Sequence, residues 1–426
     1  MAKGRPAGLR LETAERRQKQ WDESCLDDLL GPEHLARQVW DHVEGLDLSA
    51  LYGRVRTTVV SSGRPALDPA ILMSLWLYAT LDGVGSARLL DRLCASEAAY
   101  RWLCGGVGVN YHTLSDFRSE AGPLLDDLLS KSVAGLIEAG LVDVSTVAVD
   151  GLRVRASAGA GSFRRGERLE ALYEAAKAAV EQLRTEVADD PGSAERRRTA
   201  RRQAVAADRL RRLEEARAAH AEIEQRRLKE AAAQRRKNKQ NGKPVRASTS
   251  DPQARVMKMA DGGFRPAYNV QIMTAAEGSH IVGIAVTNCG SDHGLLGPAI
   301  DEIERRYGVR PKRALVDGGY HSKADIERLH GQTTEVFCPL PDNTKGDPAA
   351  PRRDDGPGVT AWRQRMASAD GQAIYKRRFA TERPHAHMRN HGLQRLLVRG
   401  VDKVKAVMLW HVHAFNFLQL RRLKPA

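Results

Sequence analysis

The sequence predicts an α/β to α+β protein, in which a mixed sheet flanked by helices follows an all-helical N-terminal part. Three observations lead to this fold class. Residues 20–140 carry capped, helix-forming runs, and from residue 141 short β-branched runs alternate with helical patterns. A charged helical stretch interrupts the second part. We therefore predict an N-terminal helical domain over 1–140, a second domain over 141–160 and 251–426 that contains the sheet, and a basic helical insertion over 161–250.

The N-terminal helices are predicted from their capping residues. Asp68 followed by Pro69 is a typical helix start, and it opens an amphipathic run to residue 83. Ser86 opens a second helix that ends at a glycine pair, 105–106, and Thr113 or Ser115 can cap a third that reaches residue 140. Short helices joined by glycine turns are typical of a helix-turn-helix module, and a plain helical support domain fits the same spacing.

The second part alternates strands and helices. A strand is expected from Leu141 to Asp150, and three strand-like runs follow the insertion, with a hairpin turn at Asp261-Gly262-Gly263. Another buried strand ends in Asp317. The remaining predictions are helices at 293–308 and 322–331, a strand at 334–341, a loop at 342–360 and two helices at about 363–392 and 393–423.

Most of the excess positive charge lies in the insertion. The chain of 426 residues has a net charge of +14, and residues 161–250 supply about +9 of it. This Ala-, Arg- and Glu-rich stretch predicts a helical hairpin, with the breaker Asp189-Asp190-Pro191-Gly192 between its helices. A solvated helix pair and a nucleic-acid surface fit this composition equally. The cationic run 235–243 favours contact with phosphates.

Composition excludes several classes of protein. No run approaches the ~18 apolar residues of a membrane span, and the first residues lack the apolar core of a secretory signal. Five scattered cysteines without a CxxC pair are typical of reduced thiols in a cytosolic protein. No GxxxxGK[ST] loop is present, so ATP-driven action is not expected.

Three carboxylates are the candidate chemical groups. Asp150 and Asp317 each end a predicted strand, where α/β folds place their sites, although an Asp-Gly pair after a strand is most often only a turn. Glu382 is the third. In a continuous helix it shares one face with Tyr375, Arg378 and Arg389, a stripe that a solvent face with an ion pair would also explain. A proline two residues after Glu382 is expected to kink or break this helix.

The spacing Tyr375-x2-Arg378-x3-Glu382-x6-Arg389 resembles the Tyr-x2-Arg-x3-Glu-x6-Lys signature of the DDE transposases of bacterial insertion sequences. The AVDG and VDGGY contexts of Asp150 and Asp317 are similar to the first and second Asp of that family. Residues 64–94 resemble its N-terminal helical domain. The chain departs from the signature by Arg389 in place of Lys, which keeps the charge but changes the geometry of a phosphate contact.

The resemblance implies a ribonuclease-H-like core in which Asp150, Asp317 and Glu382 bind two Mg²⁺ ions, or Mn²⁺ in their place, with Asp150 bridging. It implies DNA phosphate contacts for Arg378 and Arg389, and a nearby hydrogen bond or stacking contact for Tyr375. The expected activity is binding of the terminal inverted repeats of the element, followed by cleavage and strand transfer of double-stranded DNA.

A homodimer assembled on DNA, a cytoplasmic, nucleoid-associated location and no membrane partner go with this expectation. Two other readings stay open at this point. One is a non-catalytic, sequence-specific DNA-binding protein, as an inactivated transposase relative would be. The other is a metal-dependent nuclease without strand transfer.

Overall fold

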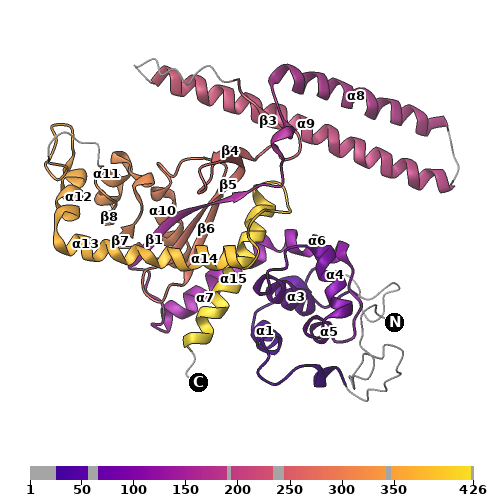
Figure 1. The fold of residues 1–426 in the computed structure, drawn as a ribbon, viewed down its shortest axis with the longest axis horizontal. Coiled ribbons are helices and arrows are strands. Elements are labelled where there is room, and N and C mark those ends of the chain that lie inside the picture. The colour runs from indigo at the N-terminus through magenta and orange to yellow at the C-terminus, as the bar shows by residue number, and fades with distance from the viewer. Residues whose placement is uncertain (1–24, 56–65, 190–192, 234–243, 342–346, 424–426) are drawn as a thin grey trace, which may run out of the picture.

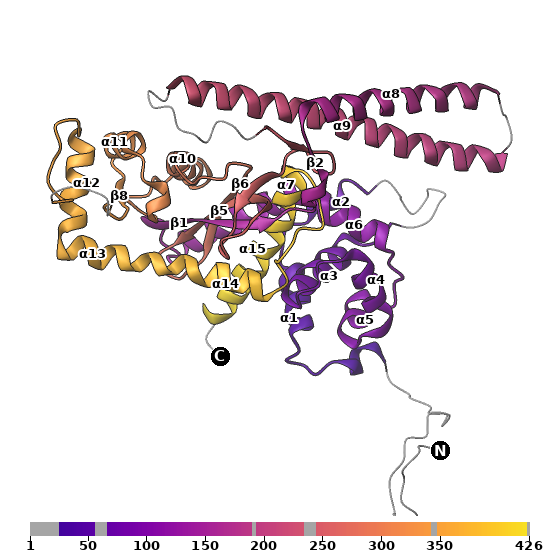
Figure 2. The same cartoon turned by 45° about the horizontal axis from the view of Figure 1, so that its top comes forward.

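The computed structural model describes residues 25–55, 66–189, 193–233, 244–341 and 347–423. Its parts are a group of N-terminal helices, a sheet with helices on both sides, and a long helical hairpin that stands out from the sheet (Figures 1 and 2). The cationic run 235–243 lies outside the described residues.

The N-terminal part is helical, as predicted. After a 3₁₀ turn, η1 (Leu26–Leu29), its helices are α1 (Leu35–Glu44), α2 (Ser49–Tyr52), α3 (Pro69–Leu81), α4 (Ala87–Ser96), α5 (Ala98–Cys104), α6 (Tyr111–Glu120) and α7 (Gly122–Glu138).

Helix α3 is the centre of this group. It begins where predicted, because the Asp68 carboxylate accepts the N–H of Ala70 at 2.8 Å and Pro69 occupies the first helical position. The predicted amphipathic pattern is wrong, since every residue of α3 except Tyr78 is buried. α1, α5, α6 and α15 pack around it, so the helix needs no polar face.

Two of the predicted helices are each divided into two. The helix predicted from Ser86 to the glycine pair breaks at Glu97. The backbone of Glu97 is extended, which separates α4 from α5. The second begins at Asn110, not at Thr113 or Ser115, because the Asn110 side chain accepts the N–H of Thr113 at 3.0 Å. It breaks between α6 and α7 close to Pro123, which has no N–H to continue the helical ladder.

The sheet is mixed, as predicted, and β1 lies at its centre. Its strands are β1 (Thr146–Arg155), β4 (Arg255–Lys258), β5 (Phe264–Ala275), β6 (Ile281–Thr287), β7 (Arg313–Leu315) and β8 (Glu335–Phe337). β1 is antiparallel to β5 on one side and parallel to β7 on the other, and β8 continues parallel to β7. β4 and β6 pair with different parts of β5, and the turn at 261–263 joins β4 to β5 as predicted.

Helices cover both sides of the sheet in both views (Figures 1 and 2). α10 (Leu296–Tyr307) and α11 (Lys323–Gly331) lie beside each other, close to the ranges that the sequence predicts. For the C-terminal segment, the prediction of only two helices is wrong. The segment contains α12 (Pro357–Ala367), α13 (Ala369–Lys376), the 3₁₀ helix η5 (Arg377–Thr381), α14 (Glu382–Asn390) and α15 (Val401–Leu423).

Turn-forming residues account for these extra breaks. Ser368 is extended and its hydroxyl accepts the N–H of Gly371 at 3.0 Å, which starts α13 as a separate helix. Gly392 and Gly400 have φ of +83° and +86°, a conformation that favours glycine and that interrupts a helix between α14 and α15.

Helix α15 joins the N-terminal helices to the sheet. On the sheet side, the Asn416 side chain accepts the N–H of Ile281 at 2.9 Å and donates to its carbonyl at 2.8 Å. On the other side, the indole N–H of Trp410 donates to the Arg118 carbonyl at 3.2 Å, and its ring lies 6.5 Å from that of Trp76. The two parts therefore share one core, and α15 crosses it.

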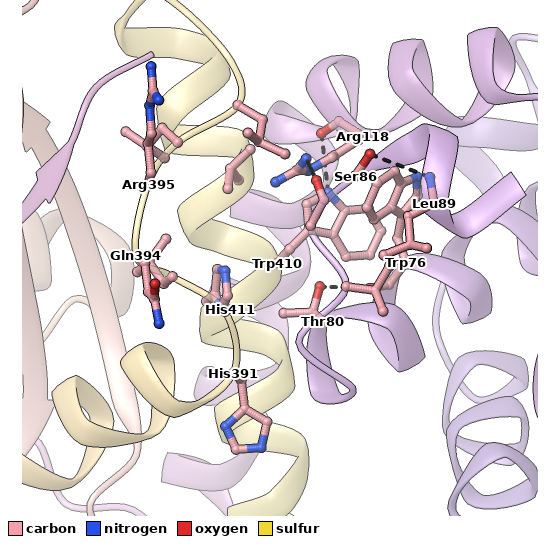
Figure 3. Close-up of a pocket in the computed structure, with 17 residues that line it drawn as sticks. Trp76, Thr80, Ser86, Leu89, Arg118, His391, Gln394, Arg395, Trp410 and His411 are labelled. Carbon is pink, nitrogen blue, oxygen red and sulfur yellow. Dashed lines mark hydrogen bonds between the residues drawn. The ribbon is translucent and has the colours of Figure 1, made fainter. Parts of the chain in front are cut away.

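A cavity of about 280 Å³ lies at this junction (Figure 3). Its floor is aromatic, from Trp76 and Trp410. The guanidinium of Arg118 donates to the Gly85 carbonyl and lies 4.9 Å from the centre of the Trp76 ring. These contacts hold the turn before α4 against α6 and α3.

The insertion is the predicted helical hairpin. Its helices are α8 (Gly166–Asp189) and α9 (Ser193–Ala233), and its base is closed by β2 (Phe163–Arg164) pairing with β3 (Ala247–Ser248). A small separate core that includes Leu169, Ala176 and Leu213 holds the two helices together.

Within the described residues, none of the helices has both the length and the apolar character that a bilayer crossing demands.

The junction at Trp410 yields a stability prediction. We expect Trp410→Ala to lower the free energy of unfolding by about 3–5 kcal/mol, because a 1%-exposed aromatic ring and its hydrogen bond are lost. Urea unfolding followed by circular dichroism measures the change. Leu228→Ala, at a side chain that is 65% exposed on α9, is the control and should stay within about 0.5 kcal/mol of the parent. Equal effects of the two changes would contradict the role given to α15.

Candidate functional site

Asp150 and Asp317 lie beside each other in the centre of the sheet. Ala148 of β1 pairs with Leu315 of β7, and the two aspartates each follow this pair by two residues. The two strands that lead to them are therefore neighbours in the sheet. The prediction that the first strand ends at Asp150 is wrong, because β1 continues to Arg155 along its antiparallel partner β5. β7 stops at Leu315, so the edge of β1 beside Asp150 is left open.

The Asp150 carboxylate is held on several sides. Oδ1 accepts the N–H of Gly151 at 2.8 Å. Oδ2 lies 3.4 Å from a guanidinium nitrogen of Arg378, 3.5 Å from the Thr381 hydroxyl and 3.8 Å from Nδ1 of His385. These three side chains come from η5 and α14, so the C-terminal segment forms one wall of the site.

A 3₁₀ segment decides which side chains make this wall. In a continuous α-helix, Arg378 would share its face with Glu382, as the sequence analysis assumes. Residues 377–381 form instead the 3₁₀ helix η5, in which residues three apart eclipse each other. Thr381 is therefore the residue that accompanies Arg378 toward Asp150, and Glu382 is displaced to an exposed position at the start of α14. The one-face prediction is wrong for this reason.

The charge at Asp150 and Asp317 is incompletely compensated. Burial raises the pKa of the Asp150 carboxyl above its usual value; Arg378 opposes this rise and Asp292 adds to it. Burial also raises the pKa of Asp317, and the neighbouring Asp150 carboxylate raises it further. Burial is the main cause of both rises, and a neighbouring carboxylate adds to each, Asp292 at Asp150 and Asp150 at Asp317. Such a pair favours a cation between them.

His385 adds no positive charge at neutral pH. Burial lowers its pKa to about 4, and the guanidinium groups of Arg389 and Arg378 add to this effect. Its contact with Asp150 is therefore one between a neutral imidazole and a carboxylate. Arg378 is the side chain that supplies a full positive charge to Asp150 among the described residues.

Asp292 is a third carboxylate at the site, which the sequence analysis missed. It raises the pKa of both Asp150 and Asp317, and its side chain is only 11% exposed. Oδ1 accepts hydrogen bonds from Asn269 at 2.7 Å and Gln271 at 2.9 Å. Nothing in its local sequence, Ser-Asp-His after a strand, distinguishes it from a turn residue.

A chain of hydrogen bonds links Asp292 to the turn that carries Asp317. Gln271 donates to Asp292 with its amide nitrogen and accepts the hydroxyl of Tyr320 with its amide oxygen. Tyr320 is buried at the end of the 3₁₀ turn η4 (Gly318–Tyr320), directly after Asp317. Arg153 approaches the second oxygen of Asp292 at 3.3 Å. The network therefore ties β1, β5 and the Asp317 turn together.

Steric constraints explain why the residue after Asp150 is a glycine. A Cβ at Gly151 would lie 2.5 Å from Oδ1 of Asp292 and 2.9 Å from the amide oxygen of Asn269. The Asp150-Gly151 pair is thus not a turn but a strand position where another carboxylate packs on the backbone.

The other predicted residues lie around this centre. Tyr375 is half-buried, and burial raises its pKa while the adjacent Arg378 opposes the rise. Arg389 is exposed on α14, four residues after His385. The structure thus brings together Asp150, Asp317, Arg378 and Tyr375, and it places Glu382 and Arg389 on the exposed side of α14.

The oxygen donors present suit a hard divalent cation. Mg²⁺ is bound in proteins through one or two carboxylates, with waters and substrate phosphates as its other ligands. Asp150 and Asp317, adjacent and with raised pKa values, meet that requirement as a pair. In the described ranges, no three side chains of His, Cys, Asp or Glu are grouped so that they could hold a metal ion.

Two family models match the chain. Residues 236–417 match a transposase DDE domain, a range that includes Asp317 and Glu382. Residues 24–120 match a second model, described as a transposase domain, which spans the helices from α1 to α6. No curated protein and no solved structure gave a significant match.

The raised pKa of Asp150 predicts an unusual gain in stability. We expect Asp150→Asn to raise the melting temperature at pH 7 by about 1–4 °C, because the ionised carboxylate is less favourable in the folded chain than in the unfolded one. The gain should shrink as the pH falls through the folded-state pKa, where the parent carboxyl takes up its proton. Differential scanning calorimetry at pH 7 and at about pH 5 measures it.

Asp126→Asn is the matched control with the opposite sign. Burial acts to raise the pKa of Asp126, but Lys405 and Arg306 outweigh it, so the pKa lies below its usual value. This variant should lose stability at pH 7. A loss for Asp150→Asn as well would contradict the picture of uncompensated charge at the site.

Proposed function

Because the chain belongs to the DDE transposases of insertion sequences, we propose that it binds the terminal inverted repeats of its own element and catalyses metal-dependent DNA cleavage and strand transfer. The observation that carries this proposal is the adjacency of Asp150 and Asp317 on parallel neighbouring strands, with Arg378 beside them. The central β1, antiparallel to β5 and parallel to β7, supports a ribonuclease-H-like core.

DDE transposases typically use a divalent metal. Asp150 and Asp317 would hold it in this chain, with Glu382 as the third carboxylate, and two Mg²⁺ or Mn²⁺ ions suit these oxygen ligands. Bound metal would activate the attacking oxygen and stabilise the leaving oxygen of a phosphodiester. Glu382 is exposed, and it directly follows Thr381, whose hydroxyl contacts Asp150, so its backbone lies next to this wall of the site.

The remaining side chains position DNA. Arg378 contacts Asp150 through one nitrogen at the long distance of 3.4 Å, so its other donors are available to a phosphate near the cleavage point. Tyr375 offers a hydroxyl beside it. Arg389, exposed on α14, is suited to a neighbouring phosphate of the same strand.

The partners that follow are double-stranded DNA at the transposon ends and at the target, and a second copy of the chain when two ends are joined. The proposed location is the cytoplasm, at the nucleoid. The exposed position of Glu382 is the one observation that favours a second candidate, a non-catalytic DNA-binding relative.

Substitution of each carboxylate tests the proposal. We expect Asp150→Asn, Asp317→Asn and Glu382→Gln to lower cleavage of a supercoiled plasmid carrying the ends by about 10³-fold or more, with end binding retained. Gel analysis of nicked and joined products with Mg²⁺, and then with EDTA, measures the activity. The control is Asp301→Asn on α10. It removes the ion pairs of Asp301 with Arg310 and Arg328, and this variant should cleave normally.

The outcomes separate the candidate functions. Binding without nicking by the parent protein would favour the non-catalytic relative, and nicking without joined products would favour a nuclease. Normal cleavage by any of the three carboxylate variants would remove that residue from the site.

Asp292 provides a separate prediction. We expect Asp292→Asn to lower cleavage by about 10–100-fold and to raise the Mg²⁺ concentration needed for half-maximal activity, because a neutral amide accepts the Gln271 hydrogen bond more weakly and loses the ion pair with Arg153, so the network holds the Asp317 turn less firmly. Mn²⁺ binding followed by electron paramagnetic resonance should weaken in parallel. An unchanged metal dependence with reduced thermal stability would mean that Asp292 serves the fold alone.

A further inference from the structure

The helical hairpin forms an arm with a core of its own. The 24 residues of α8 give it a length of about 36 Å, close to one turn of B-DNA. Its base is fastened by the β2–β3 pair and by an ion pair of Arg255 with Glu222 at 3.5 Å. In both views the arm extends over the same side of the molecule as the N-terminal helices α4 and α6 (Figures 1 and 2).

Arginines near the base of the arm are neutralised by carboxylates. Arg217 lies 2.8 Å from Glu170 across the two helices. Arg211 pairs with Asp208 and Glu215, and Arg212 pairs with Asp208. These side chains therefore have little excess charge to offer to a partner.

Arginines nearer the tip are arranged differently. Arg198, Arg201 and Arg209 follow one another on α9 at spacings that place them on a single helical face, with Val205 between them. All three are exposed, and within the described chain none of them forms an ion pair. They line a hollow of about 630 Å³ whose opposite wall is α8, near Leu183. We call these three side chains the arginine stripe.

An unneutralised stripe of guanidinium groups favours an extended polyanion. From Arg198 to Arg209 it runs for about 16 Å along the helix, long enough to meet several phosphates of one DNA strand. The three arginines of the stripe form no ion pair among the described residues, in contrast with the paired arginines of the base.

We propose that the arginine stripe binds the sugar-phosphate backbone of DNA outside the cleavage site. This inference rests on the proposed function, because it assumes that DNA held by the N-terminal helices and the carboxylate site continues past the arm. Arginine contacts to phosphate do not depend on the base sequence, so the stripe adds affinity without adding specificity.

The salt dependence of binding tests the proposal. The tip variant is R198A/R201A/R209A and the control is R211A/R212A/R217A, which removes an equal number of arginines from the same helix. Fluorescence anisotropy with the full-length protein measures the affinity for DNA between 50 and 300 mM salt. The long duplex has about 40 base pairs and contains a transposon end, and the short duplex has about 15 base pairs. Alanine preserves the helix, and circular dichroism checks this in both variants.

For the long duplex, the slope of log K against log salt should become shallower by about 2–3 in the tip variant, since three phosphate contacts are lost. The control should change it by less than about 1. On the short duplex, the tip variant and the parent should have the same slope of log K against log salt. Equal slopes for the tip variant and the parent on the long duplex would overturn the proposal.

Two further outcomes separate the causes of failure. Cleavage by the tip variant at saturating DNA should equal that of the parent, whereas Asp150→Asn should lack cleavage and keep the parent's salt slope. If neither the parent nor the tip variant cleaves, but the salt slope of the tip variant is still shallower than that of the parent, the arm binds DNA and the proposed function fails. If the tip variant loses self-association in sedimentation and keeps its slope, the stripe contacts a second copy and the DNA proposal is overturned.

Discussion

The parallel pairing of β1 with β7 is the interaction on which the site depends. It sets Asp150 beside Asp317, although burial raises the pKa of both carboxyls and so weakens the folded state at neutral pH. The arrangement persists because the surrounding structure leaves the two side chains no other place. β1 is held along its other edge by the long antiparallel β5, and the Asp317 turn is tied to the sheet through Tyr320 and Gln271.

Asp292 shows how a further carboxylate is kept at the site. It accepts hydrogen bonds from two side-chain amides and forms an ion pair with Arg153, so it stays close to the other aspartates. The glycine at 151 provides the space for it. Stability is thus given up locally at the site and recovered through the network around it, a pattern that enzymes share at their reactive groups.

The other parts of the fold are attached to the sheet that carries the site. α15 binds β6 with Asn416 and the N-terminal helices with Trp410, so the part that matches a transposase domain shares one core with the sheet. The helical hairpin has a small core of its own and is attached only at its base. One body therefore carries the site and the N-terminal helices, and a separate arm carries excess charge beyond them.

By itself, the sequence determined the helical N-terminal part, the mixed sheet, the hairpin insertion and the Asp150–Asp317 pair, because caps, strand periodicity and breaker residues are local signals. Three features were decided only by the tertiary structure. Asp292 lies in a loop and is held at the site by contacts with strands distant in the sequence, so no local sequence pattern indicates that it belongs to the site. The 3₁₀ form of 377–381 turned Thr381 inward in place of Glu382, since backbone geometry there follows packing on β1 and β5. The burial of α3 on all sides likewise depends on α15, more than 300 residues later in the chain.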